Sequence, residues 1–116
     1  MVLVVDDDPA TLVLLRKVLA QAGFAVDVAG GGAEAMTLAL TRKYDAVLLD
    51  LVMPPPDGFA VLRQIAAVAP RLLPKVIVIT SYPQRVHAAN TYALLNKPLD
   101  LREVVRLTRE CTEKQA

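Results

Sequence analysis

The sequence predicts an α/β fold, a doubly wound five-stranded parallel sheet with helices on both of its faces. Short runs rich in β-branched residues alternate with segments of helical periodicity along the chain, and such alternation is typical of parallel sheets with right-handed crossovers. Hydrophobic residues make up 54% of the 116 residues, an excess that strands buried on both faces explain. We expect a single domain over residues 1–116.

Each element is assigned from its own pattern. Strands are expected at the apolar runs, residues 2–5, 25–29, 46–49, 75–79 and 91–95. Helices are expected at residues 9–22, 33–42, 57–68 and 101–113. So few residues remain between the fourth and fifth strands that a helix over residues 81–90 should be short or irregular.

Three consecutive glycines at positions 30–32 precede the second helix. A phosphate-binding loop of the Walker type requires a Lys-Ser or Lys-Thr pair after its glycines, and no such pair follows here. We therefore interpret the three glycines as a turn into the helix.

Composition excludes several classes of protein. No apolar run approaches the roughly 18–20 residues that a membrane-spanning helix needs, and three aspartates directly after the first apolar run do not fit a signal peptide. One cysteine excludes a disulfide framework and favours a reducing compartment, so we expect a cytoplasmic protein. A net charge of +1 gives no electrostatic reason to bind nucleic acid or a membrane.

Polar residues stand where the apolar strands end, and these ends meet at one edge of a parallel sheet. They are Asp6, Asp7, Asp8, Asp50, Thr80, Ser81, Asn96 and Lys97. Each alone has an ordinary interpretation as a helix cap, a turn residue or a solvated lysine. Together they indicate a site, because clustered carboxylates repel one another and attract a hard cation such as Mg²⁺. A carboxylate can also act as a nucleophile toward phosphorus, with a cation and a lysine neutralising the charge.

The motifs resemble those of bacterial response regulator receiver domains. They are Val-Val-Asp6-Asp7-Asp8-Pro9, Leu-Leu-Asp50-Leu-Val-Met-Pro54 with Asp57-Gly58, Val-Ile-Thr80-Ser81 and Lys97-Pro98, in this order over nearly the whole chain. The resemblance implies the flavodoxin-like strand order 2-1-3-4-5. It also implies a signalling domain of a histidine–aspartate phosphorelay, which catalyses only its own phosphorylation and dephosphorylation. Its partner would be a histidine kinase or a histidine phosphotransfer protein.

The resemblance assigns a role to each site residue. Asp50 would be the phosphoacceptor. Mg²⁺ would be bound directly by Asp7, by Asp50 and by the backbone carbonyl of Val52, and mainly through water by Asp6. Asp8 could lie near the metal or cap the first helix.

Thr80 and Lys97 complete the implied site. Thr80 would bind the phosphoryl group and move inward on activation. Lys97 would pair with the phosphate, or with Asp50 in its absence, and the peptide bond to Pro98 should be cis. The resulting change would alter the face formed by the fourth strand, the following helix, the fifth strand and the last helix.

The sequence departs from the family pattern at the switch. Leu94 occupies the position of the usual aromatic switch residue, and Tyr92 is expected on the same face of the strand. Thr80 and Lys97 are only 17 positions apart, which is short for the family. These departures leave open a pseudo-receiver, a phosphorylation-independent interaction module. A haloacid-type hydrolase does not fit, because Asp50-Leu51-Val52 lacks its Asp-x-Asp motif, and a flavin carrier would not need the aspartates.

Two helical surfaces are candidate contacts. In the helix over residues 9–22 we expect six residues to face the sheet: Thr11, Leu14, Leu15, Val18, Leu19 and Ala22. Leu12 and Val13, beside Arg16, would then be exposed. They are either scattered surface apolar residues or, as the resemblance implies, the contact for the histidine-containing partner. The last helix presents a mixed charged face that is either solvated or a homodimer contact, and His87 is interpreted as a surface histidine.

Overall fold

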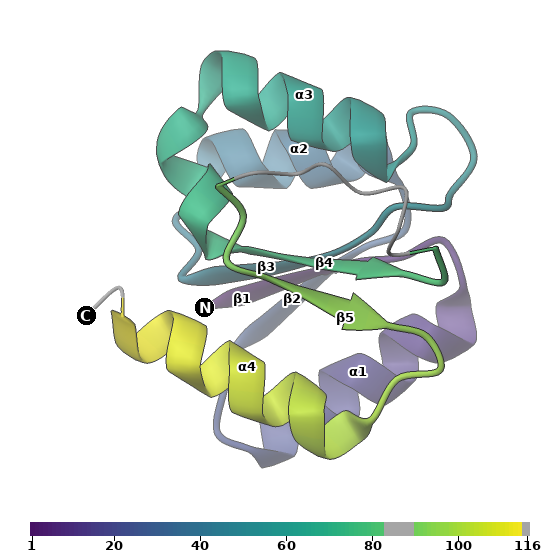
Figure 1. The fold of residues 1–116 in the computed structure, drawn as a ribbon, viewed down its shortest axis with the longest axis vertical. Helices are drawn as coiled ribbons and strands as arrows, with labels where there is room; N and C mark the ends of the chain where they lie inside the picture. Colours follow the sequence, from purple (N-terminus) through teal and green to yellow (C-terminus); the bar gives the residue numbers. More distant parts are fainter. Residues whose placement is uncertain (83–89, 115–116) are drawn as a thin grey trace.

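The fold is a five-stranded parallel sheet with helices packed against both faces. The computed structural model describes residues 1–82 and 90–114. Its strands follow the order β2-β1-β3-β4-β5, all pairs parallel, with α2 and α3 over one face and α1 and α4 over the other (Figure 1). The predicted fold class and strand order are confirmed.

The strands lie within two residues of their expected positions. They are β1 Val2–Val5, β2 Val26–Ala29, β3 Ala46–Asp50, β4 Val76–Thr80 and β5 Ala93–Asn96. β1, β3 and β4 are buried along their whole length, whereas the edge strands β2 and β5 are partly exposed. Burial on both faces explains why the three central strands are continuous apolar runs rather than alternating ones.

The helices are α1 Pro9–Gln21, α2 Gly32–Thr41, α3 Gly58–Val68, the 3₁₀ helix η1 Pro70–Lys75 and α4 Leu101–Lys114. Asp8 caps α1 and Asp57 caps α3 with their side chains, while Gly23 ends the first helical segment at a φ of 99°. No pattern in the sequence predicted η1. Most of the expected helix over residues 81–90, and the surface position of His87, lie outside the described residues.

Two apolar clusters fill the layers on either side of the sheet. Successive strand residues alternate between them: Leu3, Val47 and Val78 pack beneath α2 and α3, whereas Val4, Leu48 and Ile77 pack beneath α1 and α4. Within the described residues, no helix combines the length and the apolar character needed to cross a membrane.

One prediction for α1 is wrong. Leu15 and Leu19 are fully buried as expected, but Leu14 is 46% exposed and Leu12 packs against the core. The stripe that packs on the core therefore contains Leu12, Leu15 and Leu19 at helical spacing. Leu14 lies beside this stripe, on the exposed side of the helix. The exposed apolar pair is consequently Val13 and Leu14, not Leu12 and Val13.

The last helix, α4, buries one stripe of side chains against the sheet. Val104, Thr108 and Cys111 are fully buried. The Cys111 Sγ lies 3.6 Å from each of the carbonyl oxygens of Asp45 and Lys75, and its single S–H can donate to either of them. On the outer face, charges pair within the helix itself, because Arg106 bridges Glu103 and Glu110.

Candidate functional site

The carboxyl ends of adjacent strands bring the predicted site residues together. Asp50 is the last residue of β3 and Thr80 the last residue of β4, while Asp6 and Lys97 directly follow β1 and β5. Backbone hydrogen bonds continue past the strands, from Leu51 N to the Ile79 carbonyl (3.1 Å) and from Lys97 N to the Thr80 carbonyl (3.0 Å). The sheet itself thus fixes the spacing of the site.

Three carboxylates form the centre of the site. Oxygen atoms of Asp6, Asp7 and Asp50 lie within 4.8 Å of one another. Asp6 and Asp50 are each 1% exposed, whereas Asp7 is exposed to solvent. Two carboxylates at the base and one at the rim give an all-oxygen arrangement of the kind that Mg²⁺ prefers.

The Asp6 carboxylate is incompletely satisfied. Its Oδ1 accepts a hydrogen bond from the backbone N–H of Asp8 at 2.9 Å, but the buried Oδ2 has no hydrogen-bond partner among the described residues. Burial raises the pKa of Asp6 to about 6, and the nearby charge of Asp50 adds to this rise. A cation placed here would give the buried oxygen a partner and would offset the repulsion between Asp6 and Asp50.

Lys97 provides the positive charge that the structure brings to this cluster. Its Nζ lies 3.1 Å from Asp50 Oδ2 and 3.9 Å from Asp6 Oδ2. The peptide bond between Lys97 and Pro98 is cis, as the resemblance implied. Among the described residues, one ammonium group faces three carboxylates, so these four groups together carry a negative charge when all three carboxylates are ionised.

The loop after Asp50 is held against it. Asp50 Oδ1 accepts from the backbone N–H of Val52 at 3.1 Å, and Gly58 N donates to the Leu51 carbonyl at 3.1 Å. A Cβ on Gly58 would lie 2.3 Å from the Asp50 carbonyl oxygen and 2.4 Å from Leu51 Cα. Glycine is therefore required at position 58 for α3 to pack on the backbone of Asp50. The Asp-Gly pair marked only the start of a helix in the sequence, and this close packing was missed.

Hydrogen bonds to the backbone hold the side chains of Thr80 and Asp8 in place. Thr80 is 2% exposed, and its Oγ1 accepts from the backbone N–H of Tyr82 at 3.0 Å. Asp8 accepts from Ala10 N at 3.2 Å and from Thr11 Oγ1 at 2.7 Å, and these bonds lower its pKa. Of the two roles left open for Asp8, the geometry favours helix capping.

The expected shared face of Leu94 and Tyr92 is wrong. Leu94 pairs in register with Val78, whose side chain belongs to the cluster beneath α2 and α3. Tyr92 precedes β5 and packs on the opposite side, where its hydroxyl donates to Glu110 (3.4 Å) and its ring lies 5.3 Å from the Lys114 ammonium. The period-2 argument failed because the strand begins only at Ala93.

An apolar groove of about 290 Å³ borders the site between α1 and the segment that joins β5 to α4. It is lined by Thr11, Leu14, Leu15, Lys97, Pro98, Leu99 and Leu101. Lys97 therefore belongs both to the charged cluster and to this groove, and the exposed Leu14 side chain lies at the same surface.

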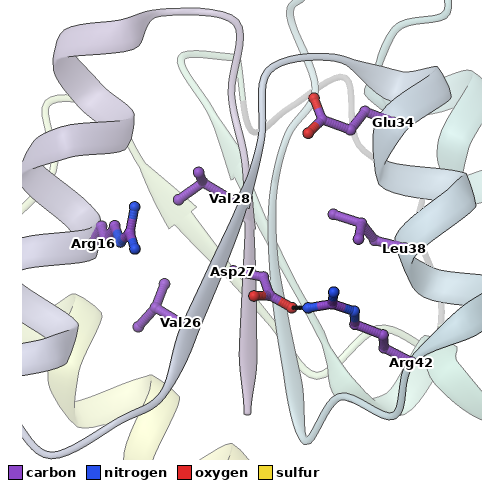
Figure 2. Close-up of a pocket in the computed structure, with 7 residues that line it drawn as sticks. All are labelled: Arg16, Val26, Asp27, Val28, Glu34, Leu38 and Arg42. Carbon is purple, nitrogen blue, oxygen red and sulfur yellow. Dashed lines mark hydrogen bonds and ion pairs between the residues drawn. The ribbon is translucent and has the colours of Figure 1, made fainter.

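A second pocket of about 280 Å³ lies at the β2 edge of the sheet, between α1 and α2 (Figure 2). Its two carboxylates accept hydrogen bonds from other groups of the chain. Asp27 Oδ2 accepts from Tyr44 Oη at 2.7 Å and from Arg42 Nη1 at 2.9 Å, and Glu34 accepts from the N–H of Gly30 at 3.1 Å. The Tyr44 and Arg42 hydrogen bonds lower the pKa of Asp27.

The chain matches the family model of the response regulator receiver domain over residues 2–109. It is 37% identical over 109 residues to the transcriptional regulatory protein ResD of Bacillus subtilis (strain 168), covering 90% of this chain and 44% of that protein. It is 37% identical over 113 residues to the response regulator MprA of Mycobacterium sp. (strain KMS), covering 93% and 48%. The chain thus spans about half the length of the curated relatives it matches.

Solved structures share the fold. The receiver domain of the Francisella response regulator 1452 superposes with a TM-score of 0.90 at 23% identity, covering 99% of this chain and 98% of that one; this likeness concerns the fold alone. The response regulator TrrA of Thermotoga maritima, solved in complex with Mg(2+)-BeF, superposes with a TM-score of 0.84 at 27% identity, covering 95% and 96%.

Proposed function

Because this chain belongs to the response regulator receiver domain family, we propose that Asp50 is its phosphoacceptor and that Asp6, Asp7 and the Val52 carbonyl hold Mg²⁺ beside it. Receiver domains serve two-component signalling and have a cognate histidine kinase. The observation that carries the proposal is the carboxylate cluster, in which the buried Asp6 Oδ2 has no hydrogen-bond partner among the described residues. The structural relative TrrA was solved in complex with Mg(2+)-BeF, which supports a magnesium-dependent site in this chain.

The chemistry follows from the groups at the site. A carboxylate oxygen of Asp50 attacks phosphorus, the new O–P bond replaces the bond to the donor, and the donor group leaves with that electron pair. Mg²⁺, when bound, supplies positive charge to the phosphoryl oxygens. Lys97 Nζ donates a hydrogen bond to Asp50 Oδ2 in the unphosphorylated protein and would donate it to the phosphoryl group after transfer. Because Thr80 Oγ1 accepts from Tyr82 N, its own O–H can be donated to a phosphoryl oxygen, which would make Thr80 the first residue of the switch. Leu94 is the remaining switch candidate on that side of the sheet.

The partner surface is proposed at α1 and the adjoining groove. Val13 is 67% and Leu14 46% exposed, Arg16 is exposed beside them, and the groove leads directly to Lys97. A histidine-bearing helix seated there would place its imidazole near Asp50. The paired charges on the outer face of α4 favour a solvated surface over a homodimer contact. We also propose that residues 1–116 form one receiver domain. We further propose that the protein is cytoplasmic.

The test is covalent modification. Wild-type protein incubated with Mg²⁺ and acetyl phosphate should gain the mass of one phosphoryl group, on Asp50. Asp50→Asn should gain none, whereas Asp27→Asn, which removes a carboxylate outside the site, should be modified like wild type. Modification that persists in Asp50→Asn, or that proceeds equally well in EDTA, contradicts the assignment. Wild-type protein that is never modified but still binds a kinase would indicate a pseudo-receiver.

A further inference from the structure

The three glycines before α2 differ sharply in their surroundings. A Cβ on Gly30 or Gly31 would meet nothing within 4 Å. A Cβ on Gly32 would lie 2.3 Å from the carbonyl oxygen of Pro56, 2.9 Å from Pro56 Cγ and 3.0 Å from Val61 Cγ2. None of the three has a positive φ. Gly32 is therefore required by the close approach of another segment and not by its own backbone conformation.

The approaching segment is the loop that follows Asp50. Residues 51–57 connect the phosphoacceptor strand to α3, and their backbone is held near Asp50 by the hydrogen bonds of Val52 N and Gly58 N. Pro56 lies toward the other end of this loop, where it contacts the first residue of α2. The loop is thus fixed from two sides, by Gly58 at the base of α3 and by Gly32 at the start of α2.

The contact cannot be relieved by a side-chain rotation. The nearest atom to the added Cβ is a backbone oxygen, and α2 is anchored to the core by Ala35, Met36 and Ala39. Ordinary contact begins near 3.4 Å, so a methyl group at position 32 requires a relative displacement of about 1 Å. Because the helix is anchored, most of that displacement falls on the loop.

We propose that Gly32 is a positioning residue for the phosphorylation site. By admitting Pro56 against the start of α2, it sets the position of the loop and hence of the Val52 carbonyl relative to the carboxylates. The inference rests on the proposed function, since it concerns the same site. A displacement of about 1 Å in a reacting assembly can reduce a rate by about 10²-fold.

The test compares alanine at the three glycine positions. Gly32→Ala should weaken Mg²⁺ binding, measured by calorimetry, and slow modification by acetyl phosphate, each by about 10- to 100-fold. Gly31→Ala and Gly30→Ala should match wild type in both measurements, because an added methyl group there meets nothing. In the metal-free protein, the amide resonance of Val52 should move in Gly32→Ala and stay in place in the two controls.

The double variant Gly32→Ala/Pro56→Gly separates positioning from folding. A flexible loop can withdraw from the methyl group, so folding and the Val52 resonance should return toward the values of Pro56→Gly alone, with a clear coupling in the double-mutant cycle. If Gly32→Ala fails to fold and Pro56→Gly does not restore it, Gly32 serves the core and the proposal is wrong. Wild-type protein that is modified while Gly32→Ala behaves like Gly31→Ala overturns the inference alone. Wild-type protein that is never modified overturns the proposed function, and the Val52 resonance still tests Gly32.

Discussion

Two aspartates on neighbouring strands show how one residue type serves opposite purposes. Asp27 lies within β2, and its carboxylate is satisfied by Tyr44 and Arg42, which lower its pKa. Asp6 follows β1, one strand away. Its buried Oδ2 has no hydrogen-bond partner among the described residues, and its pKa is raised to about 6. The described part of the chain satisfies the Asp27 carboxylate, whereas at Asp6 it leaves one carboxylate oxygen open to hydrogen bonding or to a metal. The difference distinguishes a stabilising carboxylate from a functional one.

The largest effect expected from this contrast is on metal binding. Asp7→Ala should weaken Mg²⁺ affinity by about 10²-fold, roughly 2.7 kcal/mol, because Asp7 supplies the accessible carboxylate of the cluster. Asp8→Ala is the matched control, since Asp8 caps α1 and its loss should cost about 1 kcal/mol of folding stability with little change in affinity. Calorimetric titration with Mg²⁺ measures both. If Asp8→Ala weakened the affinity more than Asp7→Ala, the metal ligand would be Asp8 and not Asp7.

The next effect sharpens the comparison at Asp6. In EDTA, Asp6→Asn should be more stable than wild type above pH 6, by about 1–3 kcal/mol. The raised pKa means that the contribution of Asp6 to wild-type stability is fully present below the ordinary value of 3.8 and is lost as pH rises through about 6. Urea unfolding at several pH values tests this, and the advantage of the variant should disappear in acid. A variant that is less stable than wild type at pH 8 would show that Asp6 is satisfied by the chain after all.

A smaller effect is expected at the β2 edge. Tyr44→Phe removes the hydroxyl that donates to Asp27 and should lower the free energy of unfolding by about 1 kcal/mol. Modification of Asp50 should proceed at the wild-type rate, because this cluster lies outside the site. Urea unfolding and intact mass give the two measurements. A substantial change in the modification rate would mean that the two regions are coupled.

The smallest effect is the acid dependence of the Asp27 cluster. Its lowered pKa means that the ionised carboxylate contributes stability above the unfolded value of 3.8, and that this contribution is lost as pH falls through the folded pKa. The stability difference between wild type and Asp27→Asn should therefore be full near neutral pH, below about 1 kcal/mol, and should close in acid. A difference that is independent of pH would assign the effect to packing.

The sequence predicted those features that depend on local order along the chain. Asp50 and Thr80 could be placed because the carboxyl ends of parallel strands meet at one edge of the sheet. Features that depend on how elements dock were missed. The phase of Leu14 on α1 depends on where the helix meets its neighbours, and the face of Tyr92 on where β5 begins.

The close approaches of Gly32 and Gly58 are distances between separate segments. The Asp27 cluster likewise joins β2 to residues that lie 15 and 17 positions away. No pattern of spacing or periodicity in one sequence carries that information. Such contacts become visible only when the helices are placed on the sheet.

The burial of Cys111 gives the protein a built-in reporter of its own opening. Burial raises the pKa of this thiol to about 11, and the thiolate is the form that reacts with alkylating reagents. It is the only cysteine in the sequence, so the rate at which a maleimide attaches to the native protein measures how often α4 lifts from the sheet or the whole domain unfolds. The alkylation rate of this one sulfur atom thus reports how often the α4 face opens. It can be compared between the apo and the phosphorylated protein without any introduced label site.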